Sequence, residues 1–183
     1  MLEGDALGPR ESLHPELERE WSQAEHPPRL VANLPYAISG PFLGRLPGRA
    51  LAGATLLLQR EVAEKAAGAV DGEWSPLSLR LALAFMPTVG RRVPAEVFWP
   101  RPQIESAFLH LLPRADAPAA EQLALLVPVL RAAFGQRRKR LLPRLERDFP
   151  EWAAALILAG VGRDERPGEL TPAHWLTALR ELK

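Results

Sequence analysis

No cysteine occurs among the 183 residues, which excludes disulfide bonds and thiolate metal sites. The four histidines are not spaced as zinc ligands are, so we predict no bound metal. No apolar run approaches the roughly 20 residues that are needed to cross a bilayer. The first ten residues carry acidic groups and no apolar stretch, unlike a signal peptide. We therefore expect a cytoplasmic protein without a membrane partner, and we expect it to be a monomer.

The net charge is only +1, but the basic residues are distributed unevenly. Residues 131–147 contain seven arginines and lysines and a single acid, Glu146. A basic cluster of this kind suits the phosphates of a nucleic acid. A solvated helix face is the alternative interpretation, and it is the more common one for a run of charges.

The pattern of apolar residues predicts an α/β fold followed by helices. Strands are predicted at residues 29–32, 54–58, 89–97 and 104–112, and helices at residues 38–46, 59–67 and 75–85. Two successive strands after alternating strands and helices indicate an open sheet that ends in an antiparallel hairpin. After a linker rich in alanine and proline, only helical patterns appear from residue 120 onward.

The segment Asn33-Leu34-Pro35-Tyr36 directly follows the first predicted strand. Ligands of open α/β sheets bind at the carboxyl ends of strands. The side-chain oxygen of Asn33 and the carbonyl of Leu34, which Pro35 keeps extended, could accept hydrogen bonds from an adenine amino group. Such bonds would favour the geometry in which the nitrogen attacks a methyl group. The ring of Tyr36 offers a stacking surface, for which the hydroxyl is not needed. An ordinary turn is the alternative interpretation.

Six segments, taken in order, resemble the bacterial small-subunit ribosomal RNA adenine N6,N6-dimethyltransferases, the kasugamycin-sensitivity family. They are residues 3–7 (EGDAL), 31–36 (VANLPY), 58–62 (LQREV), 98–107 (FWPRPQIESA), 134–140 (FGQRRKR) and 168–171 (GELT). The resemblance implies transfer of methyl groups from S-adenosylmethionine to the N6 amino groups of adjacent adenosines in ribosomal RNA of the small subunit. It also implies a partial Rossmann-like class I methyltransferase sheet within residues 1–113 and a small, all-helical RNA-binding domain at residues 120–183.

The resemblance also assigns roles to single residues. It implies that Asp5, Ala6 and Asn33 contact the cofactor and that Phe98 lies over the target base. It implies that the basic stretch contacts ribosomal RNA, through Arg137, Arg138, Lys139 and Arg140. From the residues alone, Phe98 could belong to the core, although the two prolines shortly after it favour a shaped loop and the stacking role. Asp5 could belong to an ordinary turn, and only the resemblance indicates otherwise.

One departure from the family pattern concerns the cofactor. Family members begin with an acidic residue, a Gly-x-Gly-x-Gly turn and a second acidic residue for the cofactor ribose, and this sequence contains no such turn. We therefore expect the front of the sheet to be missing. Three alternatives remain: a large-subunit RNA methylase of the macrolide-resistance type, a non-catalytic ribosome-assembly factor that binds RNA, and a decayed gene fragment.

Overall fold

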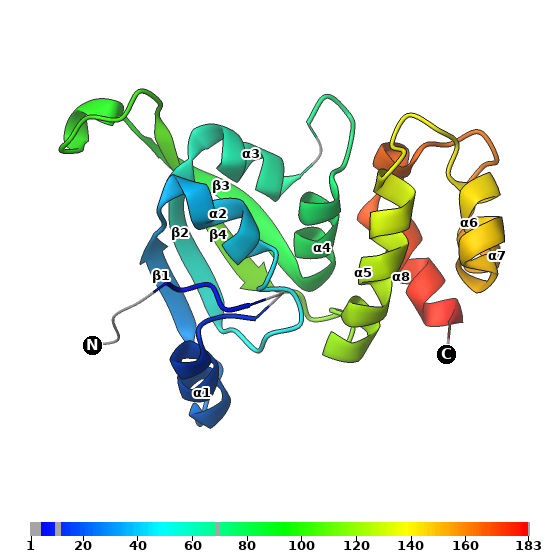
Figure 1. Cartoon of the computed structure of the whole chain (residues 1–183), viewed down its shortest axis with the longest axis horizontal. Coiled ribbons are helices and arrows are strands. Elements are labelled where there is room, and N and C mark those ends of the chain that lie inside the picture. The colour runs from blue at the N-terminus through cyan, green and yellow to red at the C-terminus, as the bar shows by residue number, and fades with distance from the viewer. Residues whose placement is uncertain (1–4, 10–11, 69, 183) are drawn as a thin grey trace.

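A computed structural model describes residues 5–9, 12–68 and 70–182 of the chain. Glu3 and Gly4, at the start of the first family-like segment, lie outside these residues. The described part contains a four-stranded sheet in the order β1-β2-β4-β3. Figure 1 shows the sheet with its helices on one side of the molecule and a group of helices on the other. The predicted α/β class is confirmed.

The sheet is built around β2 (Gly53–Gln59), which contains the strand predicted at residues 54–58. Leu56 and Leu58 of β2 are fully buried. β1 (Arg29–Asn33) pairs with β2 in parallel, and β4 (Ser106–Pro113) pairs with β2 and with β3 (Phe85–Val93) in antiparallel fashion. The predicted terminal hairpin is therefore present. β1 lies at the edge of the sheet.

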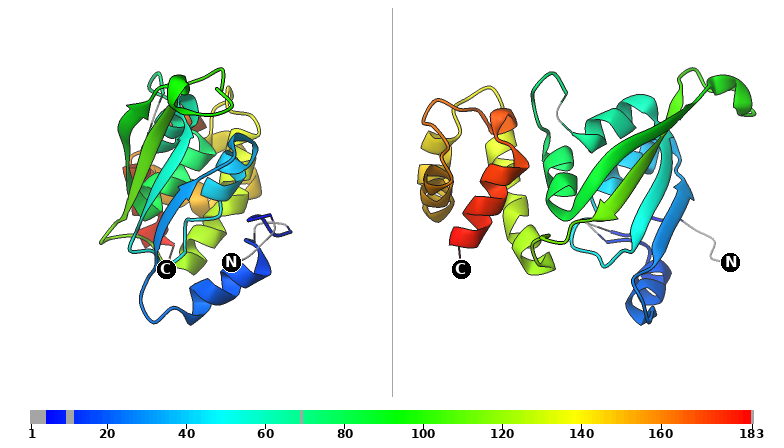
Figure 2. Two further views of the ribbon diagram at one scale, coloured as in Figure 1. Left: turned by 90° about the vertical axis from the view of Figure 1, so that its left-hand side faces the viewer. Right: turned by 180° about the vertical axis from the view of Figure 1, so that it is seen from behind.

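Three helices lie on one face of this sheet: α2 (Tyr36–Leu43), α3 (Arg60–Ala67) and α4 (Pro76–Ala84). Ser75 caps α4, and Pro76 is its first residue, a position that suits proline. Seen from behind, the strands are in view on the opposite face, where no helix of the described residues covers them (Figure 2).

Some predicted boundaries were wrong. The third strand begins at Phe85 and ends at Val93, because its backbone pairs with β4 from Phe85 onward and Pro94 has no N–H with which to continue the ladder. Residues Ala95–Val97 instead form a short 3-10 helix, η1. The fourth strand begins at Ser106, two residues later than predicted. Helix α2 begins earlier and ends at Leu43.

One helix was not predicted at all, namely α1 (Pro15–Gln23). It has a proline in its first turn and a side-chain cap from His14, but no residue of it is buried. Its half-buried Leu17 and Trp21 pack against the edge of the core. Leu17 and Trp21 lie one turn apart and are the only large apolar side chains in these nine residues, so the periodic signal is short, and the sequence reasoning passed over it.

The rest of the chain is helical, as predicted. It contains α5 (Ala120–Phe134), α6 (Leu142–Asp148), α7 (Pro150–Leu158), the 3-10 helix η2 (Pro167–Glu169) and α8 (Pro172–Glu181). Trp175 is fully buried among these helices. The buried residues of the sheet and of the helices form one contiguous core. The division into two domains therefore stays a prediction.

Candidate functional site

The segment from Asn33 to Tyr36 spans the junction between β1 and α2. Asn33 is the last residue of β1, and the N–H of Leu34 still donates to the carbonyl of Leu57 in β2, at 3.3 Å. Pro35 then caps α2, and Tyr36 is its first residue. Leu34 is buried and holds the junction on the core, whereas Asn33 is exposed and Tyr36 is half-buried. The anchored junction thus presents two polar side chains at the carboxyl end of a strand.

These four residues line a shallow cavity of about 320 Å³ together with Phe98, Trp99, Pro100 and Pro102. The structure therefore brings the four residues predicted to be catalytic together with Phe98, which is far away in the sequence. The sheet register explains why they meet. Asn33 lies opposite Leu57 of β2, and Ser106, the first residue of β4, lies opposite Gln59. The last residue of β1 and the loop before β4 consequently both lie at the carboxyl end of β2.

The ring of Tyr36 is held by a hydrogen bond that the sequence did not predict. Its hydroxyl lies 3.0 Å from the hydroxyl of Ser106, and either group can be the donor. Ser106 is almost fully buried, with 1% of its surface exposed. Since Ser106 belongs to β4 and Tyr36 to α2, this bond ties the helix to the strand that follows the Phe98 loop. Ser106 lies within a family-like segment, but nothing in that segment indicated Tyr36 as its partner.

The basic stretch predicted to contact RNA forms the exposed turn between α5 and α6. Its residues Arg138, Lys139 and Arg140 line a cavity of about 650 Å³, and Arg137 lines an adjoining one of about 460 Å³. The larger cavity also includes Arg166, which sequence reasoning missed because it lies in a later loop. We call this turn, with the two cavities that it lines, the basic turn. It lies in the helical part of the molecule, and neither cavity includes a residue of the Asn33–Tyr36 segment.

Acidic groups compensate part of this charge. Arg140 forms an ion pair with Asp164 at 3.1 Å, although both side chains are largely exposed. A hydrogen bond from Arg147 lowers the pKa of Asp148, and the same bond raises the pKa of Arg147. The basic side chains that line the larger cavity still outnumber its single acid, Asp164. Its electrostatic character therefore favours an anionic ligand.

The residues predicted to contact the cofactor are less well assembled. Asp5 is exposed, and its carboxylate accepts a hydrogen bond from the N–H of Leu7 at 2.9 Å. The carbonyl of Ala6 accepts one from the N–H of His14. Neither residue lines the cavity beside Asn33. No carboxylate lines that cavity, so its walls fit a flat, uncharged base better than they fit the ribose and sulfonium of S-adenosylmethionine.

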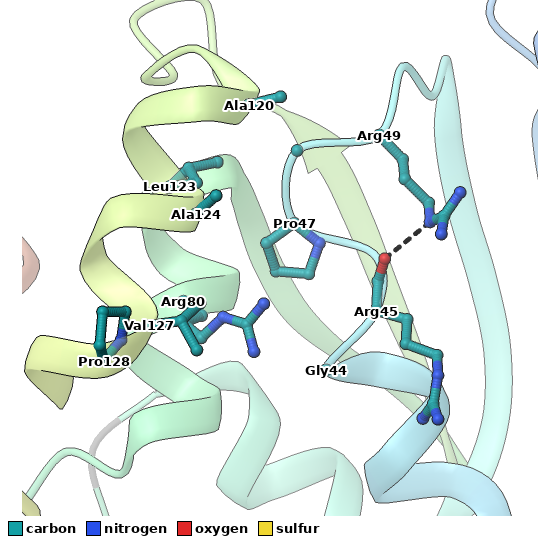
Figure 3. Close-up of a pocket in the computed structure, with 11 residues that line it drawn as sticks. Gly44, Arg45, Pro47, Arg49, Arg80, Ala120, Leu123, Ala124, Val127 and Pro128 are labelled. Carbon is teal, nitrogen blue, oxygen red and sulfur yellow. Dashed lines mark hydrogen bonds between the residues drawn. The ribbon is translucent and has the colours of Figure 1, made fainter. Parts of the chain in front are cut away.

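A further cavity, of about 520 Å³, lies between the loop before β2, α4 and α5 (Figure 3). Arg49 in this loop donates from Nε to the carbonyl of Arg45, at 2.8 Å. Its guanidinium also bonds the carboxylate of Glu18 at 2.6 Å and lies over the ring of Trp21. The bond from Arg49 lowers the pKa of Glu18. These contacts hold the chain's own α1 against the loop, so we interpret this part of the cavity wall as structural.

The part of the chain that the structure describes contains neither a cluster of metal-binding side chains nor a membrane span. Within residues 5–9, 12–68 and 70–182, no group of three or more histidines, aspartates or glutamates is placed to hold a metal ion. No helix in these same ranges has both the length and the apolar character of a membrane span.

Two solved structures have a fold similar to that of this chain. One is titled a 23S rRNA methyltransferase, ErmE, with a TM-score of 0.66 and 26% identity, covering 87% of this chain and 66% of that one. Another is a dimethyladenosine transferase from Plasmodium falciparum, with a TM-score of 0.66 and 22% identity, covering 87% and 69%. The latter likeness concerns the fold alone. The predicted class I methyltransferase fold is thereby confirmed.

The family model described as "Ribosomal RNA adenine dimethylase" matches residues 12–183, and the chain belongs to this family. A protein of Nitratidesulfovibrio vulgaris named ribosomal RNA small subunit methyltransferase A is 38% identical over 158 residues, which are 84% of this chain and 59% of that protein. Its namesake in Anaeromyxobacter sp. is also 38% identical, covering 85% and 58%. The chain thus spans less than two thirds of the length of these relatives.

Proposed function

We propose that this chain carries the adenine-binding and RNA-binding parts of an S-adenosylmethionine-dependent ribosomal RNA adenine N6-dimethyltransferase. The reaction would transfer methyl groups to the N6 atoms of adjacent adenosines in the RNA of the small subunit. One observation carries the proposal: the Asn33–Tyr36 segment and Phe98 line one cavity at the carboxyl end of β1. The curated relatives are bacterial proteins named for ribosomal RNA, and on that basis we propose the cytoplasm as the location of this one.

The target adenine must leave its stack to reach this cavity. The rings of Tyr36 and Phe98 then offer stacking surfaces, each worth about 1–3 kcal/mol. The side-chain oxygen of Asn33 and the carbonyl of Leu34 accept the two N–H bonds of the amino group. They thereby favour the pyramidal nitrogen whose lone pair is free to attack. When bound, S-adenosylmethionine supplies the methyl group.

The small subunit is the better-supported target. Curated relatives at 38% identity carry its name, whereas the similar structure titled for 23S rRNA is 26% identical. A non-catalytic assembly factor would use the basic turn for RNA in the same way, but it would not need the cavity beside Asn33. Capture of the adenine base therefore separates the two functions.

The test uses a single-stranded small-subunit rRNA fragment with adjacent adenosines and the same fragment with those two bases removed. We expect the unsubstituted chain to bind the abasic fragment about five- to a hundredfold more weakly, the range expected when one stacking interaction is removed. Tyr36→Ala and Phe98→Ala should each reduce this difference. Equal affinity of the unsubstituted chain for both fragments would favour the non-catalytic factor.

A further inference from the structure

Trp99 is the most exposed large apolar residue of the described chain, with 97% of its surface in water. Trp152 and Trp175 are buried, and the remaining tryptophans, Trp21 and Trp74, are half-buried. An indole ring removes 150–250 Å² of surface from water when it is covered, so exposing one this completely forgoes a large hydrophobic gain. A solvent-exposed position without a binding role is the alternative explanation.

The surrounding loop holds Trp99 away from the core. The loop continues the arm formed by β3 and β4, which projects from the sheet in Figure 1. Pro100 and Pro102 restrict its backbone, and an ion pair between Glu96 and Arg101 spans it. The N–H of Phe98 donates to the carbonyl of Ala95, which keeps the residue before Trp99 in its turn.

Trp99 also lines the cavity that contains Asn33, Tyr36 and Phe98. Phe98 is half-buried and faces the position proposed for the adenine, whereas Trp99 stands next to it in the chain and is open to solvent. A ligand that enters this cavity as part of a longer strand therefore brings its neighbouring nucleotide close to the indole.

We propose that Trp99 is a stacking subsite for the nucleobase adjacent to the captured adenine. This inference rests on the proposed function. Extruding a base leaves its neighbours partly unstacked, and a flat aromatic surface beside the cavity compensates for that loss. Because stacking uses the face that every base has, the subsite should accept any base at this position.

The experiment measures RNA affinity for the unsubstituted chain, Trp99→Ala and Trp99→Phe. The fragment is the one above, intact or with a single abasic site on the 5′ or the 3′ side of the adenosines. One of these abasic fragments should bind the unsubstituted chain about five- to a hundredfold more weakly. That difference should vanish in Trp99→Ala and largely survive in Trp99→Phe. Val97→Ala, on the same arm, is exposed but outside the cavity, and should behave as the unsubstituted chain.

The outcomes separate the two proposals. In one outcome, removing the adenosine bases weakens binding, but the flanking abasic sites affect Trp99→Ala as they affect the unsubstituted chain. This outcome refutes the subsite and leaves the proposed function standing. If removing the adenosine bases has no effect, both are overturned. Since Trp99 is almost fully exposed, Trp99→Ala should unfold at the same temperature as the unsubstituted chain, and a weakened fold cannot explain the result.

Discussion

Removing the hydroxyl of Ser106 should release the ring of Tyr36 while leaving the fold in place. Ser106 and Tyr36 lie on different elements, β4 and α2, and their hydroxyls are 3.0 Å apart. In Ser106→Ala the tyrosine hydroxyl loses this partner, but Tyr36 is only half-buried, so water can take the vacated position. We therefore expect the Tyr36 ring to lose its fixed orientation at the cavity wall while the fold is kept.

The magnitude follows from the kind of bond. A neutral side-chain hydrogen bond contributes about 0.5–1.5 kcal/mol to the free energy of unfolding. For a chain of this length that corresponds to a fall in melting temperature of roughly 2–4 °C per kcal/mol. The hydroxyl of Tyr36 does not itself stack on the base. If its bond to Ser106 sets the ring for stacking, however, adenine capture should weaken by a comparable free energy, which is about two- to tenfold in affinity.

Tyr36 is the single tyrosine of the sequence, so one isotope-labelled ring signal in an NMR spectrum reports on it directly. Ser106→Ala should shift this signal, whereas Ser106→Thr, which keeps a hydroxyl there, should leave the signal close to its position in the unsubstituted chain. Ser78→Ala removes an equally buried hydroxyl from α4 and serves as the control: it should lower stability without moving the signal. Fully additive effects of Ser106→Ala and Tyr36→Phe, within about 0.5 kcal/mol, would refute the coupling.

Three other changes and one measurement on the unsubstituted chain have definite expected results. Asn33→Ala, assayed in a chain joined to the preceding strands of a curated relative, should raise the methyl-transfer barrier by about 3–4 kcal/mol and leave RNA affinity nearly unchanged. Replacing basic residues of 137–140 by glutamine should make log affinity fall less steeply with log salt. The magnitude of the slope should decrease by roughly 0.7–0.9 for each phosphate that is no longer bound. The 183-residue chain should bind S-adenosylmethionine more weakly than micromolar in calorimetry, since no carboxylate lines the cavity beside Asn33. The pKa of Glu18 is lowered from 4.5, so its ion pair with Arg49 stabilises the fold above that pH and loses its effect as the pH falls through the lowered value. In Glu18→Gln, melting curves should therefore show a smaller loss of stability on acidification than in the unsubstituted chain, by about 1 kcal/mol or less.

Local signals predicted the elements that carry the site. The apolar run of β2 and the proline that follows Asn33-Leu34 located a buried strand and the end of its neighbour. Gly135 directly follows Phe134, the last residue of α5, and Pro143 lies in the first turn of α6, so both residues interrupt a continuous helix across the basic turn. These features were visible because each depends on residues that are adjacent in the sequence.

Features that depend on distant partners were not predicted. Arg166 comes from a later loop and lines the larger cavity of the basic turn. Ser106 follows Tyr36, its hydrogen-bond partner, by 70 residues in the sequence. The exposure of Trp99 was equally hidden, because composition cannot reveal which aromatic residue a turn holds away from the core. The end of β3 was misplaced because Val93 and Val97 have the same apolar character, and only the backbone pairing distinguishes them.

The position of the cavity follows from the directions of the strands around β2. β1 runs parallel to β2, so the last residue of β1 lies beside the carboxyl end of β2. β4 runs antiparallel to β2, so the first residue of β4, and the loop before it, lie beside that same end. Had β4 also run parallel to β2, its first residue, Ser106, and the loop with Phe98 would lie at the opposite end of the strands, far from Asn33 and Tyr36. A sequence that predicts the terminal hairpin therefore also implies this meeting, provided that β2 is recognised as the strand between β1 and β4. The antiparallel pairing of β4 with β2 thus places the proposed acceptor groups and the proposed stacking rings around one cavity.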